Sequence, residues 1–306
     1  MDSQHHWMAH HQTRSIFNLI LPGTHNSGAY TIDPQSFAPF THTWWLGCLG
    51  KRFVITQTRS IYQQLLDGIR SLDLRISLHK NTPWVSHTAK LLPLETVLQD
   101  VCRFVTHYPT EIIVIRLKGD WGYEPASWDS TVSLFQELCS ELLIPVSERG
   151  LSIGEMVAKH YKVLLFSDEL YNCGLQNCWP SNTWLAERWH DTASLSILKA
   201  KLFNDLTTEN TTGKFIMTGP ILTPTTSFIK HVYMRMLCSC VVVATDDGPV
   251  EWSELRDMAK DANSVALGYI RNFKQQISVK NFNILQMDFP SDELISEIIS
   301  LNTTTT

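Results

Sequence analysis

Two histidines and an arginine stand at the ends of apolar segments that predict strands. His25 and His87 each follow such a segment, and Arg75 lies on a third one, two residues after Asp73. One imidazole can take a proton and the other can give one, while a fixed cation stabilises the negative charge that builds on phosphorus. Metal-free cleavage of a phosphodiester requires this combination of groups. We therefore interpret the chain as an enzyme.

The elements that must position these residues alternate along the chain. Short β-rich segments and helical patterns follow one another, which predicts βα units and a parallel sheet. The predicted strands are 15–21, 69–76, 83–87, 111–117, 162–167, 214–219 and 283–288, with a weaker one at 241–245. The predicted helices are 59–67, 93–107, 127–142, 152–160, 191–205, 252–261, 263–276 and 291–301.

The length of 306 residues fits a single α/β barrel with insertions, because such barrels need roughly 250 residues. Two domains of about 150 residues each are the competing expectation. In a barrel, the carboxyl ends of the strands converge on one mouth. Polar residues that lie far apart in the sequence would then meet around one site.

Composition excludes several classes of protein. A net charge of −5 argues against a nucleic-acid binder, which normally presents a basic surface. The first residues lack a charged segment followed by an apolar one, so no secretory signal is expected. The apolar stretch 237–244 is far shorter than the ~18 residues that span a bilayer. The seven cysteines contain no CxxC pair, which favours reduced thiols in a cytoplasmic protein.

The motifs together resemble those of phosphatidylinositol-specific phospholipase C X-domain proteins. They occur in the family's order: Gly23-Thr24-His25-Asn26-Ser27, Leu72-Asp73-Leu74-Arg75, His87, and the segments 111–118 and 283–289. Each motif is weak alone, but five in register are specific, and they cover nearly the whole chain. The resemblance is to the small, X-domain-only, bacterial-like type.

This resemblance implies a single distorted, partly open TIM-type (β/α) barrel over residues 15–302. The residues 1–14 are expected to form a polar leader packed loosely against the barrel, and 303–306 a disordered tail.

The resemblance also implies catalytic roles. His25 is the expected general base, which takes the proton from the inositol 2-hydroxyl, and His87 is the expected general acid, which protonates the departing diacylglycerol oxygen. Arg75 would stabilise the phosphate, Asp288 would orient His25, and Asp73 would buttress the array. The expected products are diacylglycerol and inositol 1,2-cyclic phosphate.

Arg75 also bears on metal dependence. The calcium-dependent members of the family carry a metal-binding carboxylate at this position, whereas arginine has donors only and cannot coordinate a cation. We therefore expect neither a metal nor any other cofactor. Asn26 leaves two alternatives open: a vestigial calcium ligand in a calcium-assisted enzyme, or a neutral hydrogen bond that supports His87.

Further residues are candidates for binding the substrate. Lys118 resembles the family's inositol-contacting lysine, Asp168 is a weaker candidate, and Glu187 and Trp189 fall where the family places head-group contacts. The competing interpretation of Lys118 and Asp168 is a solvated strand end.

Aromatic residues near cations predict a membrane rim. Trp44 and Trp45 follow the first strand, and Phe228 and Tyr233 follow the strand at 214–219. Such rings suit the head-group layer of a membrane, and cations suit anionic lipid. Ordinary core packing explains such residues about as well.

The sequence thus predicts a cytoplasmic phosphoric diester hydrolase that acts at membrane surfaces on phosphatidylinositol or a glycosylphosphatidylinositol. A catalytically weak lipid-binding barrel is the alternative from another class. A glycerophosphodiester phosphodiesterase is disfavoured, because the His-Arg-Gly start and carboxylate metal site of that family do not occur in the chain.

Overall fold

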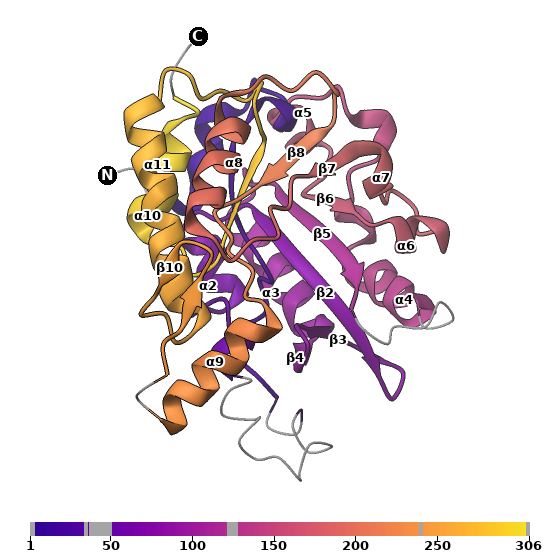
Figure 1. Cartoon of the computed structure of the whole chain (residues 1–306). Coiled ribbons are helices and arrows are strands. Elements are labelled where there is room, and N and C mark those ends of the chain that lie inside the picture. The colour runs from indigo at the N-terminus through magenta and orange to yellow at the C-terminus, as the bar shows by residue number, and fades with distance from the viewer. Residues whose placement is uncertain (1–3, 34–35, 37–50, 121–127, 239–240, 304–306) are drawn as a thin grey trace.

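A computed structural model describes residues 4–33, 36, 51–120, 128–238 and 241–303, and Figure 1 shows their arrangement. Seven parallel strands form a curved sheet in the order β7, β8, β11, β1, β2, β5, β6. Their bounds are β1 Leu21–Thr24, β2 Ser71–His79, β5 Ile113–Gly119, β6 Val163–Phe166, β7 Leu185–Glu187, β8 Phe215–Thr218 and β11 Ile284–Met287. Within the described ranges β6 and β7 do not pair with each other. The predicted α/β barrel is therefore present and is open on this side.

An antiparallel hairpin extends the sheet beyond β2. Its strands are β3 Thr82–Ser86 and β4 Lys90–Pro93, and β3 pairs with the second half of β2, from Ile76↔Val85 onward. The strand predicted at 83–87 is thus present, but it belongs to this hairpin and not to the parallel barrel. Only two residues separate β2 from β3, too few for the crossover that parallel pairing needs. His87 lies in the turn between β3 and β4.

Helices cover the outside of the sheet (Figure 1). Their bounds are α2 Ile61–Leu66, α3 Leu94–His107, α4 Trp128–Leu138, α5 Ile153–Ala158, α6 Asp168–Asn172, α7 Ser181–Trp184, α8 Leu195–Thr207, α9 Thr226–Leu237, α10 Leu255–Phe273 and α11 Asp292–Ser300. Short 3-10 helices occur at Gln4–His11, Ile16–Asn18, Ser140–Leu142 and Val146–Glu148. No helix in the described ranges has both the length and the apolar character needed to cross a bilayer.

Alternation along the strands separates an apolar outer face from a polar interior. On β2, Leu72, Leu74 and Ile76 belong to the hydrophobic cluster that packs against the helices. Successive side chains of a strand point to opposite faces, so Asp73 and Arg75 point into the barrel. The sequence Leu-Asp-Leu-Arg-Ile therefore places two charges inside the barrel without exposing an apolar residue.

The N-terminal segment is part of the core, which corrects the expectation of a loosely packed leader. Trp7 and Met8 are 5% and 0% exposed, and they share a hydrophobic cluster with interior residues at the starts of several strands, including Leu21 and Ile284. The Trp7 indole donates a hydrogen bond to the Gly68 carbonyl at 3.1 Å. The segment closes the barrel at the end opposite the carboxyl ends of the strands. The predicted tail lies outside the described residues from 304 onward.

Several predicted boundaries are wrong for identifiable reasons. The strand expected at 15–21 is a 3-10 turn at Ile16–Asn18 followed by β1 at Leu21–Thr24, because Ile16 and Leu19 fill the closed end of the barrel. The weak strand at 241–245 becomes β9 Ala244–Thr245, which pairs only with β10 Gly248–Pro249.

Other elements differ from the predictions in length or were not predicted. The helices expected at 252–261 and 263–276 are one helix, α10, because Ala262 and Asn263 lie on its buried face and continue it. The helix α9 was not predicted, and it carries Phe228 and Tyr233, the rim candidates that follow the strand expected at 214–219. The strands β4 and β7, of four and three residues, were missed because they are too short to show alternation.

We predict that Trp7→Ala lowers the free energy of unfolding by about 3–5 kcal/mol, as expected for removal of a large buried aromatic side chain. Chemical denaturation of the parent and the variant measures the difference. Tyr171→Ala is the matched control, since Tyr171 is 49% exposed. Equal losses below about 1 kcal/mol in both variants would show that the segment is not part of the core.

Candidate active site

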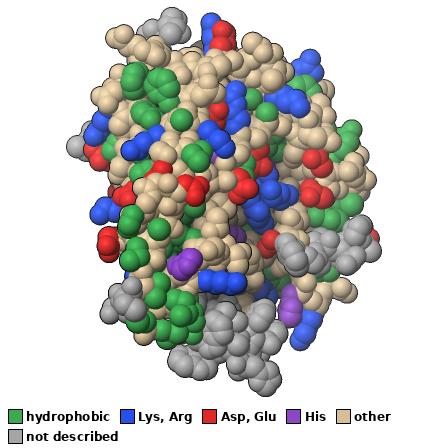
Figure 2. Space-filling model, in the orientation of Figure 1, with side chains coloured by type: hydrophobic (Ala, Val, Ile, Leu, Met, Phe, Trp, Pro, Cys, Tyr) green, Lys and Arg blue, Asp and Glu red, His purple; other side chains and the backbone are tan. Residues whose placement is uncertain are grey.

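A cavity of about 510 Å³ opens where the barrel strands end. Charged side chains of both signs gather near the middle of this face (Figure 2). The cavity is lined by His25, Asn26, Phe53, Thr56, Arg75, His87, Lys118, Glu187, Trp189, Ile221, Leu222, Thr223, Pro224, Leu255 and Asp288. It therefore brings together most of the residues that the sequence predicts for catalysis and binding.

The turn after β1 is held by its own polar residues. Asn26 has a left-handed backbone with φ 43°, which asparagine adopts more readily than most residues. The Ser27 hydroxyl accepts a hydrogen bond from the Asp73 amide at 2.8 Å and donates one to the Thr24 carbonyl at 2.9 Å. A Cβ at Gly28 would lie 2.6 Å from a Val85 methyl. The motif after the first strand therefore fixes a tight turn against β2.

His25 and Asp288 meet because β1 and β11 are neighbours in register. Thr24 pairs with Met287, so the residues that follow them lie side by side. His25 Nδ1 is 2.9 Å from Asp288 Oδ1, and both residues are buried. A proton on Nδ1 satisfies the carboxylate and leaves the lone pair of Nε2 directed to the cavity.

Asn26 contacts His25 and not His87. Its Nδ2 lies 3.0 Å from His25 Nε2, so the amide can donate to the imidazole lone pair. The interpretation of Asn26 as a direct support for His87 is therefore wrong, because the tight turn places its side chain beside the preceding residue. Within the described ranges no three His, Cys, Asp or Glu side chains are grouped as metal ligands, and the absence of a metal requirement stays a prediction.

His87 faces His25 across the cavity. The two ring centroids are 6.3 Å apart, and His87 Nδ1 lies 2.7 Å from the Val54 carbonyl. That carbonyl can only accept, so Nδ1 carries a proton and Nε2 is free toward the cavity. Burial lowers the pKa of His87, and the charges of His25 and Arg75 lower it further. The hydrogen bond that His87 donates to the Val54 carbonyl opposes this shift.

A buried ion-pair network supports the cavity floor. Arg116 Nη1 donates to Asp73 Oδ1 at 2.7 Å, and its Nη2 donates to Glu187. Asp73 also accepts a hydrogen bond from the backbone N–H of Asn26 at 3.1 Å. Burial alone would raise the pKa of Asp73, but the charges of Arg116, Arg75 and His25 outweigh it and hold the pKa below its usual value. Asp73 thus buttresses the site as a carboxylate.

Arg116 is a site residue that the sequence analysis did not single out. It lies within the segment 111–118, two residues before Lys118 and on the same side of β5. The spacing of two residues from Lys118 could have identified Arg116, because residues i and i+2 of a strand line one face.

Two cations face the cavity beside this network. Arg75 on β2 is in register with Lys118 on β5, so both lie one step nearer the mouth than the Asp73–Arg116 pair. Arg75 Nε is buried and has no hydrogen-bond partner among the described residues. Burial lowers the pKa of Lys118, and the nearby Arg116 and Arg75 lower it further. An anion between these two side chains would satisfy both.

The binding candidates divide into those that reach the cavity and one that does not. Lys118, Glu187 and Trp189 line it, and the Trp189 ring lies 5.1 Å from the His25 ring. Asp168 does not line it. This carboxylate instead accepts a hydrogen bond from the Asn182 amide at 3.0 Å, because the residue belongs to the first turn of α6.

The predicted membrane rim is only partly described. Trp44 and Trp45 lie outside the described residues. Phe228 is 3% exposed and packs in a core cluster with Trp252, so the prediction that it is a surface residue is wrong. The helical period of α9 turns Phe228 inward, and Tyr233 is half-buried.

An apolar wall of the cavity was not predicted. Phe53, Ile221, Leu222 and Leu255 line one side of it. Phe53 lies in a short helical turn at 51–54, Ile221 and Leu222 in a loop, and Leu255 at the start of α10. No periodic pattern in the sequence distinguishes them from core residues.

We predict that the free energy of unfolding falls as pH decreases below about 6.5, the ordinary pKa of histidine, and that His87→Gln makes this fall shallower. The folded pKa of His87 is lowered, so the unfolded chain binds protons there that the folded chain does not, and acid favours unfolding. Denaturation at several pH values between about 5 and 7 measures the slope.

His11 and His190 also have lowered pKa values, so part of the slope remains in His87→Gln. The exposed His79 provides the control, and His79→Gln should keep the parent slope. Identical slopes in the parent and His87→Gln would contradict the expected linkage.

Comparison with known proteins identifies a sequence relative and several structures of the same fold. No family model matches the chain. PI-PLC X domain-containing protein 2 of Mus musculus is 25% identical, over 80% of this chain and 77% of that protein.

Solved structures agree over nearly the whole chain. The phosphatidylinositol-specific phospholipase C of Listeria monocytogenes has a TM-score of 0.66 at 18% identity, covering 98% of both chains. A Staphylococcus aureus phosphatidylinositol-specific phospholipase C, studied for modulation of its membrane binding, has a TM-score of 0.64 at 15% identity, covering 98% of this chain and 97% of that chain. These structures show that the chain shares their fold, a distorted TIM barrel, and its sequence is similar to that of a PI-PLC X domain-containing protein.

Proposed function

We propose that the protein is a metal-independent phosphodiesterase that cleaves phosphatidylinositol or a glycosylphosphatidylinositol. The observation that carries this proposal is the pair His25 and His87 in one cavity, with ring centroids 6.3 Å apart. At this separation, one phosphodiester group between the rings can contact both imidazoles, each at about 3 Å. Arg75 and Lys118 supply positive charge in the same cavity.

In the proposed reaction, His25 Nε2 takes the proton from the inositol 2-hydroxyl as that oxygen attacks phosphorus. The bond from phosphorus to the diacylglycerol oxygen breaks, and His87 Nε2 gives that oxygen its proton. The products are diacylglycerol and inositol 1,2-cyclic phosphate, and atoms and charge balance. Asp288, 2.9 Å from His25 Nδ1, stabilises the imidazolium that forms.

Two features of the unliganded site must change when substrate binds. The hydroxyl must replace the Asn26 amide at His25 Nε2, which lies 3.0 Å away. His87 must also gain a proton, although burial and nearby cations lower its pKa. The negative charge of a bound phosphodiester opposes the effect of those cations and favours the protonated form. Substrate binding therefore prepares the general acid.

The remaining cavity residues fit an inositol head group. The Glu187 carboxylate can accept hydrogen bonds from ring hydroxyls, and the half-exposed Trp189 ring offers a flat apolar surface. The apolar wall of Phe53, Ile221 and Leu222 suits the glycerol end of the lipid.

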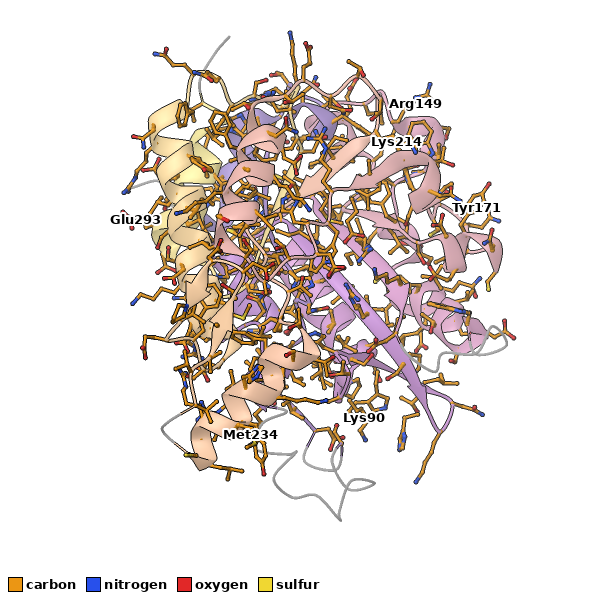
Figure 3. The ribbon with its side chains drawn as sticks, viewed as in Figure 1. Lys90, Arg149, Tyr171, Lys214, Met234 and Glu293 are labelled. Carbon is orange, nitrogen blue, oxygen red and sulfur yellow. The ribbon has the colours of Figure 1, made fainter. Side chains whose placement is uncertain are left out.

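Peripheral membrane association is part of the proposal. Met234, Met236, Leu237 and Val242 are 47%, 51%, 66% and 64% exposed. Figure 3 labels Met234 on α9, and Figure 2 shows apolar side chains gathered there. This helix follows directly after the cavity residues 221–224. Apolar side chains beside the cavity suit contact with a lipid surface. The cytoplasmic location expected from the sequence stays a prediction.

We predict that His25→Ala and His87→Ala each lower turnover of phosphatidylinositol by roughly 10²–10⁴-fold, since each removes one acid–base group. Arg75→Met should cost about 10²–10³-fold, because it removes charge stabilisation at phosphorus. The assay is release of inositol phosphate from phosphatidylinositol vesicles, with EDTA present.

The matched control is His79→Ala, which removes an exposed histidine and should turn over like the parent. Loss of parent activity with EDTA would overturn metal independence. A parent that binds phosphatidylinositol vesicles without cleaving them would favour the lipid-binding barrel instead.

We also predict that Met234→Ser combined with Leu237→Ser weakens binding to phosphatidylcholine vesicles on the order of tenfold, because exposed apolar area no longer leaves water. Vesicle co-sedimentation measures the partition. The control is Tyr171→Ser, an exposed residue on α6 that Figure 3 places away from Met234. An equal effect in both variants would reject α9 as a membrane contact.

A further inference from the structure

We propose a second anion-binding site, separate from the catalytic cavity, for a phosphate ester that carries a free hydroxyl. The site lies between the first half of α10 and the start of α11, where Arg256 and Phe289 connect two adjoining cavities. The proposal does not depend on catalysis by the histidine pair.

The larger cavity has a volume of about 380 Å³ and is lined by Thr58, Arg256, Lys260, Asn263, Ser264, Leu267, Phe289, Ser291, Glu293 and Leu294. The smaller cavity, of about 170 Å³, is lined by Lys51, Arg52, Ile55, Glu254, Arg256 and Phe289. Glu293, at the border of the larger cavity, lies at the edge of the molecule in Figure 3. The site is thus open to solvent.

Cations dominate the lining. The basic side chains are Lys51, Arg52, Arg256 and Lys260, and the acidic ones are Glu254 and Glu293. Glu293 already pairs with Arg271. Glu254 accepts a backbone hydrogen bond at the start of α10 and lies 4.0 Å from Arg256 Nε, so Lys51, Arg52 and Lys260 provide the excess positive charge. In a chain of net charge −5, this concentration of positive charge favours an anion.

Arg256 is held in place by an aromatic ring. Its guanidinium lies 5.0 Å from the centre of the Phe289 ring, a cation–π contact. Phe289 is itself fixed, because its amide donates to the Thr56 carbonyl at 2.8 Å. A cation that is already positioned loses little conformational entropy when it binds a phosphate.

Asn263 indicates that the ligand also carries a donor. Its Nδ2 donates to the carbonyls of Asp288 at 2.8 Å and Phe289 at 3.3 Å, which leaves Oδ1 as an acceptor. That oxygen is buried and receives no hydrogen bond from any described residue. A buried acceptor without a donor costs about 1–3 kcal/mol, and a hydroxyl of the ligand would relieve this cost.

The expected ligand is therefore a polyol phosphate, whose phosphate pairs with the cations and whose hydroxyl donates a hydrogen bond to Asn263 Oδ1. It can come from a soluble polyol phosphate or from the head group of an anionic phospholipid such as phosphatidylglycerol. Both sources present the same groups to the site.

The test is titration calorimetry with sn-glycerol 3-phosphate at low salt. The site variant is Arg52→Gln combined with Lys260→Gln. The control is Lys199→Gln combined with Lys280→Gln, two exposed lysines elsewhere whose loss changes the net charge equally. We expect at least tenfold weaker binding in the site variant and parent-like binding in the control.

Propyl phosphate, which lacks the hydroxyls, tests the role of Asn263 and should bind at least fivefold more weakly to the parent. A third variant, Lys118→Gln, reports on the catalytic cavity. If Lys118→Gln abolishes binding and the site variant does not weaken it, the anion occupies the catalytic cavity and the proposal is overturned. Absence of binding to the parent, or equal losses in the site and control variants, also overturns it.

Vesicles distinguish the two sources. If lipid is the source, the parent sediments more with phosphatidylcholine vesicles containing phosphatidylglycerol than with phosphatidylcholine alone, and the site variant loses this difference. If the source is soluble, the calorimetric difference is present and the two vesicle types bind the parent equally. Either result supports the site. If the proposal of the anion site fails, the assays of His25 and His87 are unaffected.

Discussion

The carboxylate of Asp73 is fully buried inside a barrel, and the partners that it requires connect the site. A charge without water needs compensating hydrogen bonds and an opposite charge. Arg116 on β5 supplies the opposite charge and also pairs with Glu187 on β7. The backbone amide of Asn26, in the turn after β1, donates a further hydrogen bond to Asp73. One carboxylate thus ties three parts of the barrel together and holds the residue after His25 in place.

The barrel has two chemically different ends. At the closed end, Trp7, Met8 and Ile16 are buried and pack with the starts of the strands. At the open end, the inward positions carry Arg75, Lys118 and other polar groups. The apolar end supplies rigidity, and the polar end can therefore carry the cations Arg75 and Lys118 at the cavity without loss of the fold. This division explains why a segment with a polar sequence at the N-terminus is nevertheless buried.

Much of the candidate site could be predicted because its residues lie at strand ends. His25, Arg75 and Asp288 reach the cavity, since the carboxyl ends of parallel strands share one mouth. His87 reaches it from the turn of the β3–β4 hairpin, which pairs with the second half of β2. Asp168 also follows a strand, but its carboxylate accepts a hydrogen bond from the Asn182 backbone amide and does not line the cavity. Position at a strand end brings a residue near the mouth, while the local backbone decides which way its side chain points.

The sequence by itself determined the alternation of most strands and helices, the polar inward positions of β2 and the family resemblance. These depend on alternation and on motifs, which are local properties of the chain. Only the tertiary structure decided that Arg116 pairs with Asp73, that Asn26 contacts His25, and that α9 turns Phe228 inward. Such contacts depend on register and on the packing of distant segments, and residue type alone does not specify either.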